Sequence, residues 1–383
     1  MSKSFCTIIV KTISMKILLL GEFSGVHWTL AEGLRKKGHE VCVVANKGGW
    51  RNYRRDVALD RKSSGFLDSC RYLLRLLLLL PTWRGYDVVQ IIGPAYFVEL
   101  KPKRAYQLYK YLRKHNKKVF MAAYGDDYYY VKACVEKHRF RYCDFYTTTS
   151  TIDNARNRES IQEWLHSDKK EYNKKIATDC DGIPTCLYEY QVAYAPYFKN
   201  KTRYIPLPIN TDELSPRQPI NDSKVHFFIG IQRERSVLKG TNIMYDALLR
   251  LAKEYPERCV VEKAESVPYT IYQELMNRSD VLLDQLYSYT PAMNALLAMA
   301  KGIVVVGGGE EEHYQLLGEK ELHPLINVAP TEKAVYKALE QLVLYPEQLQ
   351  RLSEESIRYV ETYHHYERVA EKYLSFWENP LQS

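Results

Sequence analysis

The chain has 383 residues, of which 46% are hydrophobic and 26% charged. Disordered chains combine low hydrophobicity with high net charge, so this composition excludes disorder, and the length suggests two domains, or three at most. Apolar runs stay shorter than the roughly 20 residues of a membrane-spanning helix. The longest candidate, residues 73–80, contains Arg75 and stops at Pro81.

Net charge is unevenly distributed along the chain. The total is +8, but residues 1–120 carry 23 Lys and Arg against 8 Asp and Glu, a net +15, which leaves −7 for the remainder. A basic first third favours contact with an anionic surface such as lipid headgroups, a phosphorylated substrate or nucleic acid. A solvated charged face is the alternative that the sequence leaves open.

The cysteines give no sign of a metal site or a disulfide framework, because no two of the eight form a C-x-x-C pair. We therefore expect no bound metal and a reducing, cytoplasmic compartment. Residues 1–14 are weakly apolar, with two lysines and no small-residue cleavage site, which disfavours a signal peptide. We interpret them as an extension before the first element, with Met15 as a second candidate start.

A first α/β series begins at Met15. A continuous apolar run, a glycine turn, an amphipathic segment and a second apolar run form a βαβ unit, which implies a parallel sheet. Residues 144–205 are mixed in pattern. The predicted strands of this series are residues 15–20, 41–45, 87–92 and 118–123.

A second α/β series follows a polar, proline-bearing linker at residues 210–224. Its predicted strands are residues 225–231, 259–264, 281–286 and 303–309. Its predicted helices are residues 241–255, 271–278 and 291–302, followed by a helical tail from Pro330.

This alternation predicts two Rossmann-like domains that face a cleft, with the last helix crossing back onto the first domain. We expect an extension at residues 1–14, a first, acceptor domain at 15–208, a second, donor domain at 209–354 and a returning helix at 355–383.

The turn from Gly21 to Gly25 lies at the carboxyl end of the first strand, where open α/β sheets bind ligands. It lacks the G-x-G-x-x-G pattern, and no acid ends the second strand, so a dehydrogenase is disfavoured. Gly25 and His27 are candidates for an acceptor or phosphate loop. A simple tight turn and a structural histidine are the alternatives.

A basic loop follows the first strand of the second series and contains Arg233, Arg235 and Lys239 before Gly240. Guanidinium groups pair with phosphates through two hydrogen bonds, and an ammonium group adds a point charge. The loop therefore predicts a diphosphate site, with a solvated charge run as the alternative.

Four segments in this order resemble the retaining, nucleotide-sugar-dependent glycosyltransferases of family 4 (glycosyl transferases group 1), which have the GT-B fold. They are the opening strand, turn and helix at 15–41, the strand YDVVQIIGP at 86–94, the crossover YIPLPIN at 204–210, and Arg233 with Lys239-Gly240, which matches the family's "R…KG" pair. The resemblance spans residues 15 to about 363.

One family motif is incomplete. The family's E-x7-E glutamates are replaced by Tyr289 and Leu297, although the following "AMA-x-G" at residues 298–302 is retained. Because the second glutamate holds the nucleotide ribose in the family, ribose recognition stays open. The resemblance makes Thr290 and Asn294, near a helix start that attracts phosphate, candidates for donor binding.

Two further loops match family motifs. Tyr124-Gly125-Asp126-Asp127 stands at the family's "H-G-S-D", and Asp127 matches its acid, so Asp126 and Asp127 are the catalytic candidates. A turn cap, or the metal-binding acids of a GT-A enzyme, are the alternatives. Gly308 and Glu310 match a "GGhPE" turn that approaches the donor sugar. A simple helix cap is the alternative there.

The resemblance implies a hexosyltransferase-type enzyme that moves a sugar, with retention, from a nucleoside diphosphate sugar to a glycan or lipid-linked acceptor of cell-surface polysaccharide. It implies no cofactor and no metal, since Arg233 and Lys239 neutralise the diphosphate. The other readings are a sugar- or nucleotide-binding pseudoenzyme and a nucleotide-sugar epimerase. The basic residues lack a recognised nucleic-acid module, so a nucleic-acid partner is not expected.

A Leu-rich helix at residues 66–80 has many cations nearby, which predicts peripheral attachment to an anionic membrane, such as the inner face of the cytoplasmic membrane. Core leucines with solvated cations are the alternative. The cations are Arg51, Arg54, Arg55, Arg61, Lys62, Arg71, Arg75 and Arg84.

Overall fold

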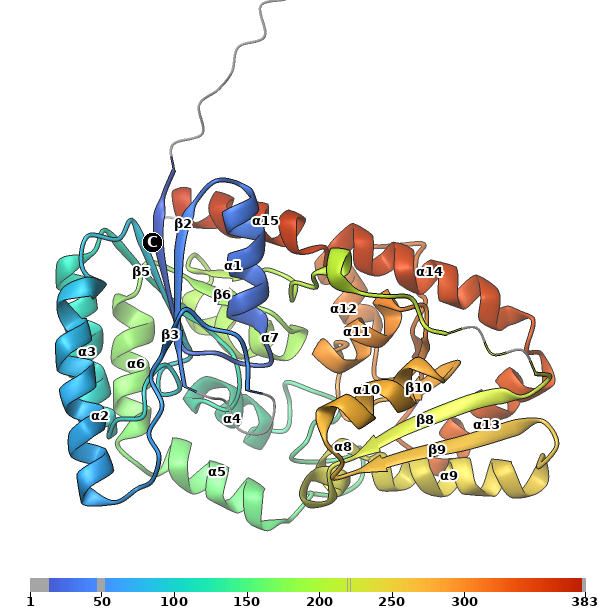
Figure 1. The fold of residues 1–383 in the computed structure, drawn as a ribbon. Coiled ribbons are helices and arrows are strands. Elements are labelled where there is room, and N and C mark those ends of the chain that lie inside the picture. The colour runs from blue at the N-terminus through green and yellow to red at the C-terminus, as the bar shows by residue number, and fades with distance from the viewer. Residues whose placement is uncertain (1–13, 47–51, 219, 221, 381–383) are drawn as a thin grey trace, which may run out of the picture.

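The computed structural model describes residues 14–46, 52–218, 220 and 222–380. It contains two five-stranded sheets, one for each α/β series, and every strand pair within them is parallel (Figure 1). The predicted two-domain α/β architecture is confirmed. Most of the predicted extension, residues 1–13, lies outside the described part of the chain.

The first sheet has the order β3-β2-β1-β4-β5. Its strands are β1 (Lys16–Leu20), β2 (Glu40–Ala45), β3 (Val57–Ala58), β4 (Val88–Ile92) and β5 (Lys118–Ala122). A short parallel pair, β6 (Ile183–Thr185) and β7 (Thr202–Tyr204), continues it, since the N–H of Met121 donates to the carbonyl of Gly182 at 3.1 Å.

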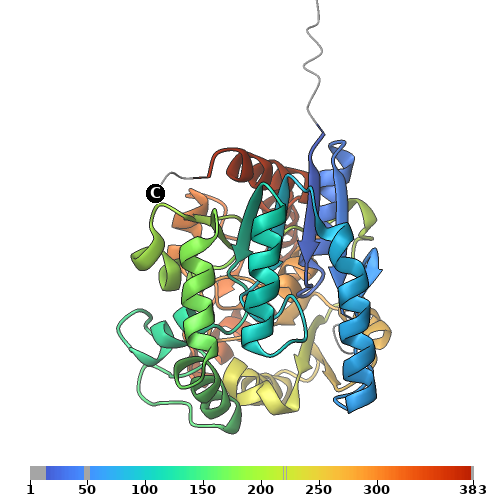
Figure 2. The same ribbon diagram turned by 90° about the vertical axis from the view of Figure 1, so that its left-hand side faces the viewer.

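The first sheet is covered on both faces. Leu18 and Leu20 of β1 join a hydrophobic cluster with Tyr72 and Leu76, whereas Ile17 and Leu19 join a separate cluster on the opposite face. This explains the uninterrupted apolar run at 15–20. Figure 2 shows α2, α3 and α6 beside one another on one face. The helices of this half are α1 (Val26–Lys36), α2 (Phe66–Leu79), α3 (Pro102–His115), α4 (Tyr128–Val135), α5 (Ala155–Leu165), α6 (Lys169–Asp179) and α7 (Tyr188–Phe198).

The second sheet has the order β12-β11-β10-β8-β9. Its strands are β8 (Val225–Ile231), β9 (Cys259–Glu265), β10 (Val281–Leu283), β11 (Val304–Gly307) and β12 (Ile326–Asn327). The helices of this half are α8 (Ser236–Lys239), α9 (Thr241–Glu254), α10 (Tyr269–Asn277), α11 (Met293–Ala300), α12 (Glu311–Leu317) and α13 (Glu332–Leu344).

Two strands of the second sheet end earlier than predicted. β10 stops at Leu283 and β11 at Gly307, because the chain turns there and Gly308 N–H bonds to the carbonyl of Gln285 at 2.8 Å. The residues after β10 are thereby free to line the space between the domains.

The C-terminal segment crosses back to the first domain, as predicted, but as two helices. These are α14 (Gln348–Tyr363) and α15 (Tyr366–Glu378). The chain is extended at His365, and the crossover residue Ile209 bonds to both sides of the break, accepting from Tyr366 N–H at 3.0 Å and donating to the carbonyl of His364 at 2.7 Å. The crossover segment at Ile209 and the junction between α14 and α15 are thus hydrogen-bonded to each other.

Helix α15 packs closely against α1. A Cβ on Gly33 would lie 2.6 Å from the carbonyl oxygen of Tyr366, so only glycine permits this approach. Tyr373 and Phe376 of α15 enter the same hydrophobic cluster as Leu30. None of the helices in the described residues is long and apolar enough to cross a membrane.

Candidate functional site

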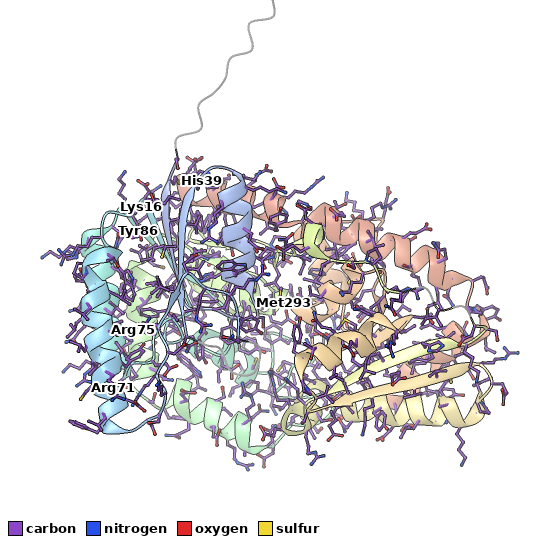
Figure 3. The ribbon with its side chains drawn as sticks, in the orientation of Figure 1. Lys16, His39, Arg71, Arg75, Tyr86 and Met293 are labelled. Atoms are coloured by element: carbon purple, nitrogen blue, oxygen red, sulfur yellow. The ribbon has the colours of Figure 1, made fainter. Side chains whose placement is uncertain are left out.

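Two cavities lie at the carboxyl ends of the second sheet's strands. One, of about 380 Å³, is lined by both domains, and the other, of about 1000 Å³, lies against β8, β9 and α10. The two cavities form one continuous site, because four residues line both of them: Gln232, Arg235, Lys239 and Asn294. Figure 3 places Met293, a wall of the smaller cavity, between the two halves of the molecule.

The basic loop after β8 brings its cations to this site. Arg235 and Lys239 line both cavities, and the buried Nε atom of Arg235 has no hydrogen-bond partner among the described residues. Arg233 lines the larger cavity only, its side chain is 83% exposed, and it pairs with Glu265 at 2.7 Å. Arg235 is therefore better placed than Arg233 to meet a ligand that spans both cavities.

Gly240 shapes this loop but does not line either cavity. Its φ of 68° is left-handed, and a Cβ there would lie 2.9 Å from the Cβ of Leu286. Glycine thus lets α8 end and α9 begin within one residue.

Asn294 sits at the start of α11 in a small polar network. Its amide donates to Asp284 at 2.9 Å and accepts the hydroxyl of Tyr272 at 3.0 Å. Burial raises the pKa of Asp284, while nearby Lys239 and the Asn294 bond act in the opposite direction. This network fixes the floor of the larger cavity beside Lys239.

Asp144 is one of two carboxylates, with Glu189, that the first domain presents to the smaller cavity. The hydroxyl of Tyr130 donates to it at 2.8 Å. Burial and, to a smaller extent, the charge of Asp126 raise the pKa of Asp144, the Tyr130 bond and the charge of Arg235 oppose the increase, and the net pKa is about 6. An acid–base group therefore faces a cation of the opposite domain.

The predicted catalytic pair, Asp126 and Asp127, does not line either cavity. Asp127 is fully buried, caps α4 by accepting Tyr130 N–H at 2.9 Å, and accepts the hydroxyl of Tyr194 at 2.6 Å. Asp126 accepts the Ser160 hydroxyl at 2.8 Å. The structure thus gives Asp127 the capping role that the sequence left as an alternative, and it gives Asp126 a side-chain bond to α5.

The first glycine loop also serves the fold. Gly25 has a φ of 83° and caps α1. His27 is fully buried, and its Nδ1 donates to the carbonyl of Gly21 at 2.8 Å, which leaves Nε2 to accept from Gln90 at 3.1 Å. Burial lowers the pKa of His27 to about 4, so the ring is neutral. Neither Gly25 nor His27 lines the cavities.

Thr290 and Glu310, both predicted to bind the donor, contact residues of the first domain. Thr290 is buried, and its hydroxyl donates to Glu189 at 3.1 Å while accepting from Tyr188 N–H at 2.9 Å. Glu310 accepts from the guanidinium of Arg141 at 2.7 Å and from the hydroxyl of Tyr142. These side chains bind the two domains together.

Gly308 is also a packing residue. A Cβ there would lie 1.8 Å from the carbonyl oxygen of Ser288, so the β11 turn packs directly on the loop before α11. Neither Gly308 nor Glu310 lines the cavities. Of the predicted residues, the structure brings together Arg233, Arg235, Lys239 and Asn294, and it places the others in the surrounding scaffold.

Three potential metal ligands lie together behind the smaller cavity, where Cys134, Cys143 and Asp144 have ligand atoms within 4.8 Å of one another. Burial raises the pKa of the Cys134 thiol well above its usual value. A protonated thiol is a poor metal ligand, because binding requires the thiolate. A metal bound here would have to displace the proton of the Cys134 thiol.

Sequence reasoning missed Asp144 and Glu189, which both line the smaller cavity. Each is an isolated acid in an aromatic segment, Cys-Asp144-Phe-Tyr and Leu-Tyr-Glu189-Tyr. A lone acid among aromatic residues is a usable signal, because a buried carboxylate needs a specific partner.

No known family model matches the chain, and no curated protein resembles it in sequence. Several solved structures are similar to it in fold. Sucrose-phosphate synthase from Thermosynechococcus elongatus is 13% identical, with 95% of this chain and 98% of that chain covered and a TM-score of 0.59. The catalytic domain of starch synthase IV from Arabidopsis thaliana, bound to ADP and acarbose, is 12% identical over 96% and 99%, with a TM-score of 0.60. Anabaena HepE with UDP and glucose is 9% identical over 95% and 99%, with a TM-score of 0.56.

These similarities, over nearly the whole chain, define the class of fold. The chain has the GT-B fold, with two Rossmann-like domains facing a cleft and a C-terminal helix that returns to the first domain. Fold alone does not assign an activity. Membership of family 4 stays a prediction.

Proposed function

We propose that this protein is a glycosyltransferase that takes a sugar from a nucleoside diphosphate sugar and transfers it to a glycan or lipid-linked acceptor. The observation that carries the proposal is the joint lining of both cavities by Arg235 and Lys239. Two cations at the carboxyl end of β8 provide the charge that a diphosphate requires.

In this proposal, the donor lies across the two cavities. Its diphosphate bonds to Arg235 and Lys239, and Arg233 contributes at the rim, where its exposure and its pairing with Glu265 weaken its contact. The buried Nε of Arg235, which has no partner among the described residues, supports ranking Arg235 above Arg233 as a diphosphate ligand. Residues 209–354 would hold the donor and residues 15–208 the acceptor.

The proposed chemistry proceeds with retention, without a metal or cofactor. The cations stabilise the leaving diphosphate, and a phosphate oxygen receives the proton of the incoming hydroxyl, so positioning and electrostatics dominate. Asp144 lies on the acceptor side of the smaller cavity, opposite Arg235. Its carboxylate would accept a hydrogen bond from a sugar hydroxyl and orient it. We place this activity in the cytoplasm.

A non-catalytic sugar- or nucleotide-binding protein is the second candidate, because the two family glutamates are absent. The ring of Tyr289 is buried among first-domain aromatic residues, and Leu297 packs against the core. Neither side chain replaces a ribose-binding carboxylate. Hydrolysis or transfer from a UDP- or GDP-sugar would distinguish an enzyme from a binder, and a change of sugar configuration without transfer would indicate an epimerase.

Calorimetric titration with UDP, GDP and ADP tests the donor site directly. Charge-assisted hydrogen bonds contribute roughly 1.5–3 kcal/mol, so Lys239→Ala and Arg235→Ala should each weaken the preferred diphosphate about 10- to 100-fold. Nucleoside affinity should change little. Arg250→Ala is the matched control, because this arginine lies on α9 of the same domain, outside both cavities. Unchanged diphosphate affinity in both site variants would rule the proposal out.

A further inference from the structure

Helix α2 exposes an apolar stripe that no part of the described chain covers. The sequence leaves open whether its leucines form core, and the structure shows that only Tyr72 and Leu76 of this helix are buried. The exposed apolar side chains, with their exposed fractions, are Phe66 (81%), Leu67 (70%), Leu74 (60%), Leu77 (61%) and Leu78 (70%).

The spacing of these residues places them on one side of the helix. Leu67, Leu74 and Leu78 are seven and four residues apart, and Leu77 is adjacent, which matches successive turns of an α-helix. The opposite side packs on the first sheet through Tyr72 and Leu76. An outward-facing stripe of this size has no structural role in the isolated molecule and marks an interaction surface.

Cations border the stripe. Arg71 is 75% exposed and lies 3.5 Å from Asp68 of the same helix, and Arg75, one turn later, is also exposed. Figure 3 shows both arginines on the outer side of the first domain. Arg84, beyond the end of α2, donates to the hydroxyl of Tyr111, which itself donates to the carbonyl of Leu80 at 2.7 Å.

The neighbouring helix α3 adds positive charge to the same face. It carries five Lys and Arg and no Asp or Glu over its length; of these, Arg113 pairs with Asp179 and Asp181, which leaves Lys103, Arg104, Lys110 and Lys114. Figures 1 and 2 place α2 and α3 on the same side of the first sheet, away from the second domain. The face is therefore both apolar and basic.

Other cations that the sequence grouped with this helix are engaged elsewhere. Arg54 lies between Glu32 and Glu213, and Arg55 pairs with Asp60 at 3.1 Å. Arg61 bonds to Ser69 and to the carbonyl of Ser64. Arg51 lies outside the described residues.

We propose that the exposed side of α2, together with the basic surface of α3, docks this protein onto an anionic lipid bilayer. Leucine side chains would enter the boundary between headgroups and acyl chains, and arginines would pair with lipid phosphates above them. A second copy of the chain suits this face less well, because symmetric pairing would bring two cation-rich α3 surfaces together. The proposal does not depend on the glycosyl-transfer chemistry.

Sedimentation with vesicles tests the proposal. The full chain should bind vesicles of phosphatidylglycerol mixed with phosphatidylcholine, and raising the salt from about 0.05 M to about 0.5 M should weaken binding, since it screens the headgroup charge. Phosphatidylcholine vesicles should bind much less. Absence of sedimentation with anionic vesicles at low salt would overturn the proposal.

Two sets of variants identify the surface. Leu74→Gln with Leu77→Gln and Leu78→Gln should lower the partition coefficient about 100-fold, because these side chains provide the apolar contact. Arg71→Gln with Arg75→Gln should lower it roughly 10-fold. All five side chains are exposed, so thermal stability should be unchanged.

Matched controls use exposed residues of other surfaces. Leu249→Gln with Ile271→Gln and Ile357→Gln removes apolar groups that are 37–45% exposed, and Arg250→Gln with Arg351→Gln removes exposed cations. These controls should bind vesicles like the unmodified protein. An equal loss of vesicle binding in the control and α2 variants would show that α2 is not a membrane surface. The same conclusion would follow if the protein did not bind vesicles and instead formed a concentration-dependent dimer that the leucine variant abolished.

Discussion

Glu189 on α7 of the first domain accepts the backbone N–H of Tyr289 from the second domain at 2.6 Å. The same carboxylate accepts the hydroxyl of Thr290 at 3.1 Å, and all three residues are buried. Because Glu189 also lines the smaller cavity, this contact sets the spacing of the two domains where both meet a ligand.

Loss of the Glu189 carboxylate should loosen this contact. Glu189→Ala would strand the Tyr289 N–H and the Thr290 hydroxyl, and each buried unsatisfied donor costs about 1–3 kcal/mol. The free energy of unfolding, measured with denaturant, should fall by a few kcal/mol. Glu163→Ala, an exposed glutamate on α5, is the control and should change it little. Equal stability of Glu189→Ala and the unmodified protein would contradict an interdomain role.

Tyr289, at the position of the first family glutamate, should not tolerate restoration of that glutamate. The centroid of its ring lies 5.1 Å from that of Tyr188 and 5.2 Å from that of Tyr142. Its hydroxyl oxygen accepts the backbone N–H of Arg141 at 2.6 Å. Tyr289→Glu would empty this aromatic site and bury a carboxylate, so stability should fall by about 3–5 kcal/mol.

Tyr289→Phe is the matched control, because it keeps the ring and removes only the hydroxyl. It should cost about 1–2 kcal/mol, the penalty for one unsatisfied N–H. Thermal unfolding of the two variants gives the comparison. A Tyr289→Glu protein that is as stable as Tyr289→Phe, with improved nucleotide binding, would mean that this position can still act as in the family.

Local pattern was sufficient to predict most of the sheets. The four apolar residues from Ile17 to Leu20 can only be buried on both faces, and they are. The basic loop was found because chain order alone places the residues after β8 at the ligand edge of the sheet. The broken C-terminal helix was not predicted, since the extended residue His365 is held by Ile209, about 150 residues earlier in the chain.

The site residues were harder to predict, because burial decides their roles. Asp127 follows the apolar strand β5 and Asp144 lies in an aromatic segment, but Asp127 is enclosed by Tyr130 and Tyr194 whereas Asp144 faces a cavity. Glu189 comes from a segment without clear periodicity, and its partner lies 100 residues further along the chain. The aromatic segment around Glu189 indicates a buried acid, but it does not indicate which distant residue is the partner.

The buried carboxyl of Asp127 should make stability depend on pH. Burial raises its pKa from the usual value of 3.8 to about 7, so the neutral form is favoured in the folded protein. Its stabilising contribution is therefore complete below pH 3.8 and is lost as pH rises through about 7.

Asp127→Asn keeps a neutral side chain that can still cap α4. Its stability should therefore not decrease as pH rises through about 7. The free energy of unfolding of the variant relative to the unmodified protein should increase by up to about 4 kcal/mol between pH 4 and pH 8. Denaturant unfolding across that range gives the value. If the difference between the two proteins were the same at every pH, Asp127 would not titrate on folding.

If the protein catalyses the proposed glycosyl transfer, protonation of Asp144 should cause the decrease of kcat on the acidic side, or acidic limb, of the pH–rate profile. Its pKa of about 6 means that the carboxylate is mainly ionised above pH 6 and protonated below it. If the ionised form accepts a hydrogen bond from the reacting sugar, kcat should fall as pH decreases through about 6. Asp144→Asn should lower kcat roughly 100-fold or more and remove this limb, because an amide does not titrate.

The nucleotide affinity of Asp144→Asn separates this role from a structural one. Diphosphate binding should stay within about threefold of the unmodified protein, because the proposed phosphate contacts come from Arg235 and Lys239. Asp126→Asn is the control, since Asp126 is a neighbouring acid that does not line the cavity. It should retain the acidic limb, shifted slightly to lower pH, because Asp126 contributes to the raised pKa of Asp144. An unchanged limb in Asp144→Asn would assign the titration to another group.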